Sequence, residues 1–540
     1  MRWKRSLRCC WRLWQRMKCS KCWRPDRWAF LWACDGSNVG KAPGHKKLKN
    51  QGTYLHGEAS LLMMRALRVV VWLGIALFSI LYCLSVSRYW KLSNDSITYV
   101  LAGQSLAAGT GYLEAGRTVD LYPPGTSALF AVGWLAGRRS YFVLNAEVVA
   151  FALGSMVICF LLFRDSLGSL GAATVVLMCL ASTTLFRWST FLLSDIFYLF
   201  FSLLALWLYS RGLAPGTGVA VLAACAIRLV GVSLAAAVLI DAVKPRRKRW
   251  AVAAEMAGAI SFVALWELRN ARRGWSHTGL MLENDPWIAS HGLITPVGLL
   301  HRFFLNLRHF HLLENLLTNG LTANVVIGIL LAVICGIGFR ELCKPNTAAA
   351  IYCILLSLIV AVYHPWIEER WLLPLLPFLF ACLFLGVRSI AARTGNSAYL
   401  AFALFAALYL VVGLRFELAR IPLERATPFP GERVKFPENY DLQKIALWWR
   451  QHSSLDDKFA SDHPALTQVI TGRTGVHYPE SDQSDVLENE LARDQVFYVF
   501  VDLSSARDNV WVLSAIEKSA SFQLLLSEPR ARLYHFTPPR

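Results

Sequence analysis

One carboxylate stands out because of its position and its polar neighbours. Asp95 comes a few residues after a long apolar segment, within the polar run 93–96 (Ser-Asn-Asp-Ser), and the motif 122–125 (Tyr-Pro-Pro-Gly) lies further along the same polar stretch. Nothing about packing requires an acid at such a position, whereas a positioned carboxylate is a common general base for a hydroxyl proton. Asp95 is therefore the first candidate for a catalytic base.

The polar run 93–96 also has a purely structural interpretation. Its residues are of types that cap helices, and residues 97–107 have a helical pattern, so Asp95 would be an N-cap. The joint occurrence of the acid and the Tyr-Pro-Pro-Gly motif favours catalysis. The two prolines should end one surface helix and start another over 126–136, which is too short to cross a bilayer.

Two further acids and an arginine have residue types suited to the same chemistry. Asp120 is a second carboxylate of the site or a turn residue, and Asp195 is a second acid or the cap of a helix over 196–209. Arg228 interrupts an apolar stretch, where a charge is costly without a partner or a cavity. Phosphate binding by Arg228 and an ion pair with Asp195 or Glu147 both remain open.

Arg370 and Arg187 stand at the ends of apolar segments, where side chains reach the depth of lipid headgroups. A guanidinium group binds phosphate through two parallel hydrogen bonds. Arg370 would bind a lipid phosphate or extend its charged end out of the membrane, and Arg187 would bind phosphate or anchor the interface. A carboxylate combined with arginines suits a reaction in which a phosphate leaves and a hydroxyl loses a proton.

The elements that must position these residues are transmembrane helices. Of the 540 residues, 55% are hydrophobic and 17% are charged, which is too apolar for a soluble chain. Runs that approach or exceed about 18–20 apolar residues predict membrane spans, and they occur at 67–87, 141–163, 170–186, 191–209, 250–268, 324–339, 347–363, 371–387 and 398–414. The stretch 216–243 is predicted to form two short helices around Arg228. The fold expected is an α-helical polytopic membrane protein with about 11 transmembrane helices.

Lys and Arg concentrate in the loops that stay in the cytoplasm, which gives the orientation. The basic cluster 244–249 and the N-terminal arm 1–65 mark the cytoplasmic side of a membrane domain over 66–416. Four loops then share the extracytoplasmic face: 88–140, 187–190, 269–322 and 364–370. We expect a multi-pass protein of a plasma membrane or bacterial inner membrane, with Asp95 outside.

The net charge of +19 comes mostly from the arm 1–65, which holds 15 Lys or Arg and three acids. A basic arm beside a first transmembrane helix is typical of a topology determinant or a contact with anionic lipids, and no nucleic-acid partner is predicted. We expect the arm to be disordered. Cys19 and Cys22 form a single CxxC pair, which is half of a zinc site, so no metal site is predicted there.

Residues 417–540 are predicted to form a small extracytoplasmic α/β domain. The pattern indicates a helix over 442–451 and β-rich runs at 495–501 and 531–536. Helix and strand signals mixed within about 100 residues favour a compact α/β fold. Because no cysteine comes after Cys382, this domain contains no disulfide.

The ordered series of motifs resembles the GT-C superfamily of membrane glycosyltransferases. This superfamily includes protein O-mannosyltransferases, the aminoarabinose transferases of lipid A and the bacterial RgtA/B/C/D-like proteins. Besides the first-loop motifs, the resemblance rests on 187–195 (Arg-Trp-Ser-Thr-Phe-Leu-Leu-Ser-Asp), 226–231 (Ala-Ile-Arg-Leu-Val-Gly), 369–377 (Glu-Arg-Trp-Leu-Leu-Pro-Leu-Leu-Pro) and 471–473 (Thr-Gly-Arg). Each motif is short, and their order over 67–540 carries the resemblance.

The resemblance implies an inverting transfer of a sugar from a polyprenyl phosphate donor to a hydroxyl group of a glycan, lipid or protein. The residues that it assigns are Asp95 as the base, with Asp195 and Asp120 as further acids; Arg228, Arg370 and Arg187 for the donor phosphate; and Tyr99, Tyr122, Pro123 and Pro124 for the substrate loop. No cofactor is assigned. The first loop has no Asp-x-Asp pair, which favours a metal-independent site and leaves a divalent metal open. Ser96 comes after Asp95 where O-mannosyltransferases carry a second acid, which argues against transfer specifically to protein Ser or Thr.

Two other classes of protein would account for parts of this pattern. A transporter or flippase of lipid-linked saccharides would explain many spans and a buried arginine, but it predicts a repeat between the two halves, and the sequence has none. A non-catalytic membrane scaffold would leave Asp95 and Arg370 far apart in space.

Overall fold

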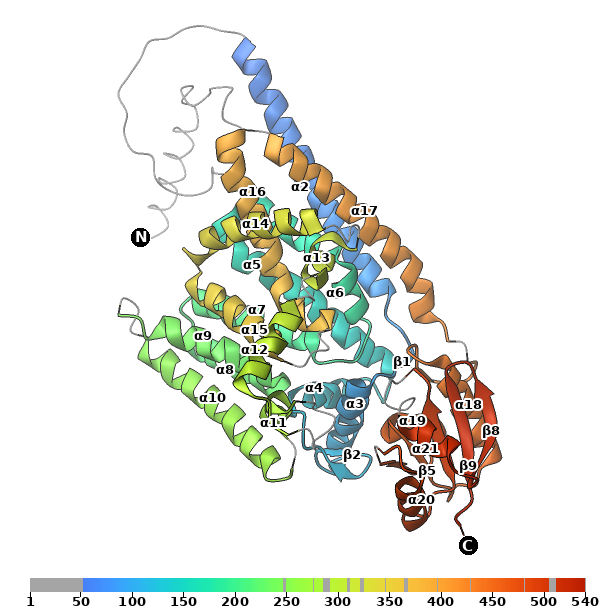
Figure 1. Ribbon diagram of the computed structural model, residues 1–540. Coiled ribbons are helices and arrows are strands. Elements are labelled where there is room, and N and C mark those ends of the chain that lie inside the picture. Colours follow the sequence, from blue (N-terminus) through green and yellow to red (C-terminus); the bar gives the residue numbers. More distant parts are fainter. Residues whose placement is uncertain are drawn as a thin grey trace.

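The computed structural model is mostly helical, with a small strand-containing region at the C-terminus (Figure 1). It describes residues 52–245, 249–274, 276–284, 292–307, 311–320, 325–344, 346–363, 368–395, 397–427, 429–479, 481–504 and 511–539. The greater part of the arm 1–65, with Cys19 and Cys22, and the centre of the basic cluster 244–249 lie outside these residues. Their predicted roles stay predictions.

Six helical segments among the described residues are long and apolar enough to cross a membrane. They lie in α2 (Gly52–Leu84), α5 (Tyr141–Leu180), α10 (Trp250–Ala271), α14 (Val325–Cys343), α16 (Leu376–Thr394) with the 3-10 turn η5 (Glu369–Leu375) before it, and α17 (Ser397–Arg425). The chain is thus an integral membrane protein.

Shorter apolar helices complete the bundle. They are α4 (Gly125–Ala136), α7 (Asp195–Ser210), α8 (Ala214–Ile227), α9 (Val232–Ala242) with the turn η2 (Leu229–Gly231) before it, and α15 (Thr347–Val362). The predicted total of about 11 spans is not confirmed by the six long segments and stays a prediction. Two of the predicted spans, 141–163 and 170–186, fall largely within α5, which is interrupted at Gly168 by a φ of 73° that glycine tolerates.

The predicted pair of short helices around Arg228 is present as α8 and α9. Arg228 itself is extended, with φ −145° and ψ 131°, so the helix ends there and restarts through η2. The reversal is tight at Gly231, where an added Cβ would lie 2.8 Å from the backbone nitrogen of Cys225. This close approach is why the sequence needs a glycine three residues after the arginine.

Two short helices lie at the end of the bundle that carries the polar motifs. The first, α3 (Asn94–Ala107), has Ser93 as its N-cap, and the backbone N–H of Ser93 donates to Ser96 Oγ at 2.9 Å. The second, α4, begins at the glycine of the Tyr-Pro-Pro-Gly motif, one residue before the predicted start. The prediction that the two prolines also end a surface helix is wrong, because α3 ends at Ala107 and the hairpin β2–β3 follows it. A Cβ on Gly125 would lie 2.5 Å from the carbonyl oxygen of Ala226, so only glycine lets α4 meet the end of α8.

The remaining elements of the membrane part are small. They are the strand β1 (Trp90–Lys91), the hairpin β2 (Leu113–Glu114) and β3 (Arg117–Thr118), and the helices α6 (Thr183–Trp188), α11 (His277–Leu282), α12 (Pro296–Leu307) and α13 (His311–Thr318).

The C-terminal region is a five-stranded mixed sheet with helices, in the strand order β6-β5-β7-β9-β8. Its elements are β4 (Val434–Lys435), α18 (Tyr440–His452), β5 (Phe459–Ser461), α19 (Pro464–Thr471), β6 (Gly475–His477), α20 (Ser484–Arg493), β7 (Tyr498–Asp502), α21 (Leu513–Glu517), β8 (Phe522–Glu528) and β9 (Ala531–Phe536). The helix predicted over 442–451 and the β-rich runs at 495–501 and 531–536 correspond to α18, β7 and β9.

The C-terminal region contacts the first loop directly. In Figure 1 the red C-terminal elements lie beside α3 and β1, and α19 packs against α3. Strand β4 pairs with β1 in parallel, with Trp90 opposite Val434 and Lys91 opposite Lys435. The long helices α2 and α17 also pack together and bring the chain from the bundle to this junction.

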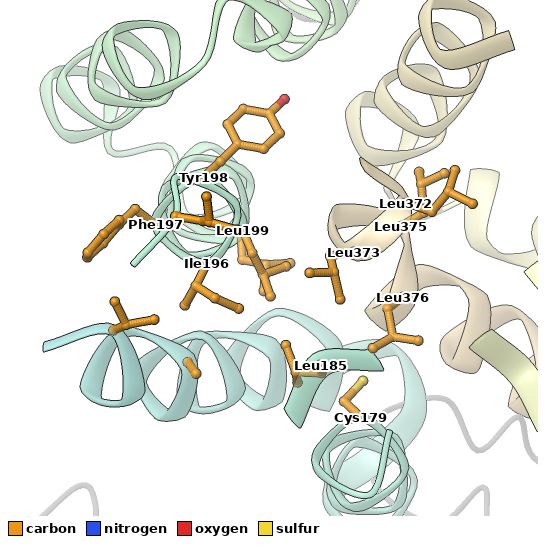
Figure 2. Packing of buried hydrophobic residues seen from close by; sticks show 14 of the residues in the cluster. Cys179, Leu185, Ile196, Phe197, Tyr198, Leu199, Leu372, Leu373, Leu375 and Leu376 are labelled. Carbon is orange, nitrogen blue, oxygen red and sulfur yellow. The ribbon is translucent and has the colours of Figure 1, made fainter. Parts of the chain in front are cut away.

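An apolar core supports the polar end of the bundle. Figure 2 shows Leu373 and Leu376, from η5 and the start of α16, facing Ile196 and Leu199 of α7 and Leu185 of α6. All five side chains are buried. Close packing of this kind drives helix association where no water is available to be excluded. It fixes η5 beside the first turn of α7, which holds Asp195.

Candidate active site

Four segments far apart in sequence bring their charged residues together. Asp95 lies in the first turn of α3, Asp195 in the first turn of α7, Arg228 in the break between α8 and η2, and Arg370 in η5. Arg370 Nη1 is 2.7 Å from Asp95 Oδ2 and 3.9 Å from Asp195 Oδ2, and Arg228 pairs directly with Asp195. The scaffold alternative predicted that Asp95 and Arg370 lie apart, and they are in contact.

Arg370 is the centre of this group. Besides the two aspartates, its Nε pairs with the carboxylate of Glu368, and its guanidinium carbon lies 5.6 Å from the ring centroid of Trp188. The arginine side chain is 12% exposed, whereas Glu368 is 48% exposed. A nearly buried cation thus faces three carboxylates, and one of them stays open to solvent.

Tyr122 connects the Tyr-Pro-Pro-Gly motif to the acid. Its hydroxyl donates to Asp95 Oδ1 at 2.8 Å, and its ring lies edge-on to Tyr99 at 5.1 Å. The Tyr99 hydroxyl in turn donates to Ser194 Oγ at 3.2 Å, next to Asp195. The substrate loop predicted from sequence therefore contacts Asp95 directly and reaches the residue before Asp195.

Backbone contacts hold that motif in place. The hydroxyl of Tyr112 donates to the carbonyl oxygen of Tyr122 at 3.0 Å and to that of Pro123 at 3.3 Å, and Pro124 is the N-cap of α4. The interpretation of Asp95 as a helix N-cap is wrong, because Ser93 occupies that position and the carboxylate is engaged by a tyrosine and an arginine.

Burial and the charge of Arg370 have opposite effects on the pKa values of two acids that contact this arginine, Asp95 and Glu368. Burial by itself would raise the pKa of Asp95, but the Arg370 guanidinium and the Tyr122 hydrogen bond outweigh it and hold the pKa below its usual value. For Glu368, burial dominates and raises the pKa despite the same guanidinium. Asp95 is therefore ionised at neutral pH, and it is a weak base while the arginine holds it.

Two of the residues assigned by the resemblance lie outside this group. Asp120 pairs with Arg273, just after the end of α10, at 2.6 Å and approaches Arg269, in the last turn of α10, at 3.7 Å. Arg269 also donates to the carbonyl oxygen of Val119 at 3.1 Å, so these contacts tie the first loop to α10. Arg187 is exposed, lies 5.2 Å from the Trp188 ring centroid, and forms no ion pair with a described residue.

For Arg228 the sequence leaves open phosphate binding and an ion pair with Asp195 or Glu147, and the structure identifies the ion-pair partner. Its ion-pair partner is Asp195, and among the described residues Glu147 makes no such pair with it. The Asp195 side chain is 1% exposed, whereas that of Arg228 keeps 23% of its surface accessible. The Asp195 carboxylate is therefore enclosed by the protein, whereas the Arg228 guanidinium is accessible to a ligand.

Sequence reasoning missed several polar residues around the group. Glu368 immediately precedes the motif 369–377, and its place beside Glu369 and Arg370 was a usable signal. The His277 ring lies 6.1 Å from Tyr122, and Tyr363 packs edge-on against Trp371 at 4.9 Å. The two rings come from segments without a local motif, so only the fold brings them to the site.

The cations next to the two central acids are arginines. Within the described ranges, no group of three or more His, Cys, Asp or Glu side chains is arranged to hold a metal ion. The carboxylates of the site can accept a proton, and its guanidinium groups can neutralise an anion.

Comparison with known proteins gives the fold. No family model and no curated protein matches the chain. Its structure is similar to that of ArnT from Cupriavidus metallidurans bound to undecaprenyl phosphate, at 13% identity and a TM-score of 0.55, over 86% of this chain and 97% of that one. It is also similar to the Archaeoglobus fulgidus oligosaccharyltransferase in complex with zinc and sulfate, at 13% identity and a TM-score of 0.53, over 85% and 72%. Both are GT-C glycosyltransferases.

Proposed function

Because the chain has the fold of the GT-C membrane glycosyltransferases, we propose that it transfers a sugar from a polyprenyl phosphate donor to an acceptor hydroxyl with inversion. The observation that carries this proposal is the contact of Arg370 with Asp95 and its approach to Asp195. That the similar ArnT structure contains undecaprenyl phosphate supports a donor of this lipid class.

In the proposed reaction, Asp95 accepts the proton of the acceptor hydroxyl. The acceptor oxygen attacks the anomeric carbon from the face opposite the phosphate, and the bond between that carbon and the phosphate oxygen breaks. Its electron pair leaves with the polyprenyl phosphate, whose negative charge grows by one. Arg370 and Arg228 would stabilise this charge, since positioned cations act where charge develops. A single displacement of this kind inverts the configuration of the sugar.

Donor binding would also activate the base. Arg370 contacts Asp95, and a donor phosphate would compete with the carboxylate for the same guanidinium. Once the arginine turns to the phosphate, burial acts on Asp95 with less opposition and its pKa rises. A base with a higher pKa accepts a hydroxyl proton more readily, so the enzyme would become competent only after the donor arrives.

The other assigned residues take supporting roles in this proposal. Asp195 is buried and would hold Arg228 in position without touching substrate. Tyr122 would orient Asp95, and Tyr99 would orient the start of α7 through Ser194. Asp120 would fix the loop to α10, and the exposed Arg187 would attract the phosphate from the membrane surface. From the loop charges, we assign the site and residues 417–540 to the extracytoplasmic face and the N-terminus to the cytoplasm.

The proposal is tested with purified protein, labelled polyprenyl phosphate-sugars and candidate acceptors. We expect label to leave one of the lipids only when an acceptor is present, and to remain on it with the Asp95→Asn variant. Transport of an intact lipid-linked sugar across a vesicle membrane, without cleavage of the sugar–phosphate bond, would instead identify the flippase alternative.

A further inference from the structure

A cluster of buried charges joins the first loop to the C-terminal region. We call it the junction cluster, and it consists of Lys91 of β1, Lys435 of β4 and Glu424 near the end of α17. All three side chains are almost fully buried. Lys91 Nζ is 2.7 Å from Glu424 Oε2, and both of these side chains are 2% exposed. None of the three residues touches the acids and arginines of the site.

Lys91 connects three segments that the proposed reaction needs. It lies four residues before Asp95, it donates a hydrogen bond to Thr190 Oγ1, and its Nζ lies 3.8 Å from the ring centroid of Phe191. Thr190 and Phe191 belong to the segment that leads into the first turn of α7. One buried ammonium group thus contacts the approaches to both site aspartates as well as the end of α17.

Lys435 reaches the end of α17 on the other side. Its Nζ donates to the carbonyl oxygens of Leu423, Glu424 and Ala426 at 2.9, 2.7 and 3.1 Å. These are carbonyl groups at the C-terminal end of the helix, which have no partner within it and carry the negative end of its dipole. The chain leaving α17 is therefore held against β4 by a cation.

The register of the β1–β4 pair places two lysines side by side, and Glu424 balances their charge. Lys91 and Lys435 are opposite each other in the β1–β4 pair, where like charges repel. Glu424 lies against Lys91 and also accepts from Arg420 Nε at 2.7 Å. Apolar residues often fill such a space as stably as a buried ion pair, so our hypothesis is that these charges are kept for the single arrangement they permit.

We propose that Lys91 is a positioning residue for sugar transfer: through Glu424 it ties the Asp95 loop to the C-terminal region in the one register that holds Asp95 at Arg370. The inference rests on the proposed function. It gives the C-terminal region a task in catalysis, because the loop that carries the base is fixed from that region as well as from the membrane helices.

The test compares Lys91→Met with Lys444→Met. Lys444 also forms a 2.7 Å ion pair, with Glu528 in the C-terminal region, but it is 60% exposed and lies in α18, outside β1, β4 and α17. In Lys91→Met the Glu424 carboxylate keeps Arg420 as a partner, so no orphaned charge is created. We expect kcat to fall by a factor on the order of 10² at an unchanged donor KM, the cost of a base displaced by about 1 Å. Lys444→Met should keep the kcat of the unmodified protein.

A second readout is independent of activity. Asn94 Nδ2 lies 3.1 Å from His463 Nε2. In a protein that carries Asn94→Cys and His463→Cys, a short bifunctional thiol reagent should therefore join the two positions, and mass spectrometry detects the linked peptides. We expect Lys91→Met to lower the yield of this cross-link severalfold and Lys444→Met to leave it unchanged. A fall in kcat without loss of the cross-link, or the reverse, overturns the proposal.

Two outcomes need their own controls. If Lys91→Met does not fold, Glu424→Asp takes its place, because it keeps every charge and shortens the reach to Lys91; we expect both readouts to fall, and unchanged values overturn the proposal. If the unmodified protein transfers no sugar from any donor, the proposed function fails. An unchanged cross-link in Lys91→Met would then show separately that the junction cluster does not hold the loop.

Discussion

At the scale of single residues, the contact between Asp95 and Arg370 sets the properties of the site. The guanidinium holds the carboxylate in its ionised form and also weakens it as a base. A donor phosphate is the natural competitor for that guanidinium. In the proposed reaction, this contact would delay proton removal until a donor phosphate draws the guanidinium away from Asp95.

The contribution of Tyr122 to the pKa of Asp95 can be measured. Tyr122→Phe removes a hydrogen bond that lowers this pKa. Because a general base must be unprotonated, a higher pKa moves the acid limb of the kcat/KM profile to higher pH. We expect this shift together with a loss of activity of about tenfold or less. Tyr99→Phe is the control, because that hydroxyl donates to Ser194 and not to the acid. An acid limb at the same pH in both variants would contradict the assignment.

The two roles of Arg228 can be separated with a double variant. Arg228→Ala removes a cation from the phosphate site and also leaves the buried Asp195 with Arg370, at 3.9 Å, as its nearest cation. We expect kcat/KM for the donor to fall by a factor on the order of 10–10² and the melting temperature to drop. Adding Asp195→Asn should restore the melting temperature and leave donor use impaired. Recovery of both would make Arg228 a purely structural residue.

At the scale of the elements, the sequence predicts the helices, strands and breaks well, but it predicts the contacts between distant elements poorly. The break at Arg228, the start of α4 and the elements α18, β7 and β9 can be predicted from prolines, glycines and hydrophobic patterns. The ion pair between Asp95 and Arg370 joins residues 275 positions apart, and β1 and β4 are two residues long. No local pattern encodes such contacts. Rejecting the N-cap interpretation of Asp95 therefore needed the fold.

Gly125 tests whether the meeting of α4 and α8 positions the site. A Cβ at this position would collide with the carbonyl oxygen of Ala226, two residues before Arg228. We expect Gly125→Ala to cost about 1–3 kcal/mol of stability and to lower transfer in proportion to the displacement of Arg228. Gly258→Ala in α10 is the matched control, since nothing lies within 4 Å of its added Cβ. Equal melting temperatures and activities in the two variants would argue against this role.

At the scale of the whole molecule, the site lies where a membrane bundle meets a strand-containing region. The helices supply both arginines and Asp195, while the loop that carries Asp95 pairs with β4. Such an arrangement suits a donor that arrives within the membrane and an acceptor that arrives from the aqueous side. The hydrophobic pattern of the sequence predicts the two parts. Their contacts, which include the β1–β4 pair, the packing of α19 on α3 and the buried junction cluster, are not revealed by composition.

The orientation of the molecule can be determined by labelling with a membrane-impermeant thiol reagent in intact cells. Asp456→Cys lies in an exposed position of the C-terminal region, and Leu213→Cys lies in the loop after the far end of α7. We expect the cysteine at 456 to react and the one at 213 to react only after permeabilisation. The opposite pattern would place the site in the cytoplasm and exclude the proposed orientation.

The most direct test of the central claim is sugar transfer by Asp95→Asn, measured beside donor binding by the same protein. The amide keeps the size of the side chain but cannot accept the hydroxyl proton at neutral pH. We predict a folded protein whose transfer rate is lower by a factor of about 10²–10⁴, the usual contribution of a general base. Donor affinity should be retained or increased, because Arg370 no longer has to leave a carboxylate. Transfer at the rate of the unmodified protein would show that Asp95 is not the base.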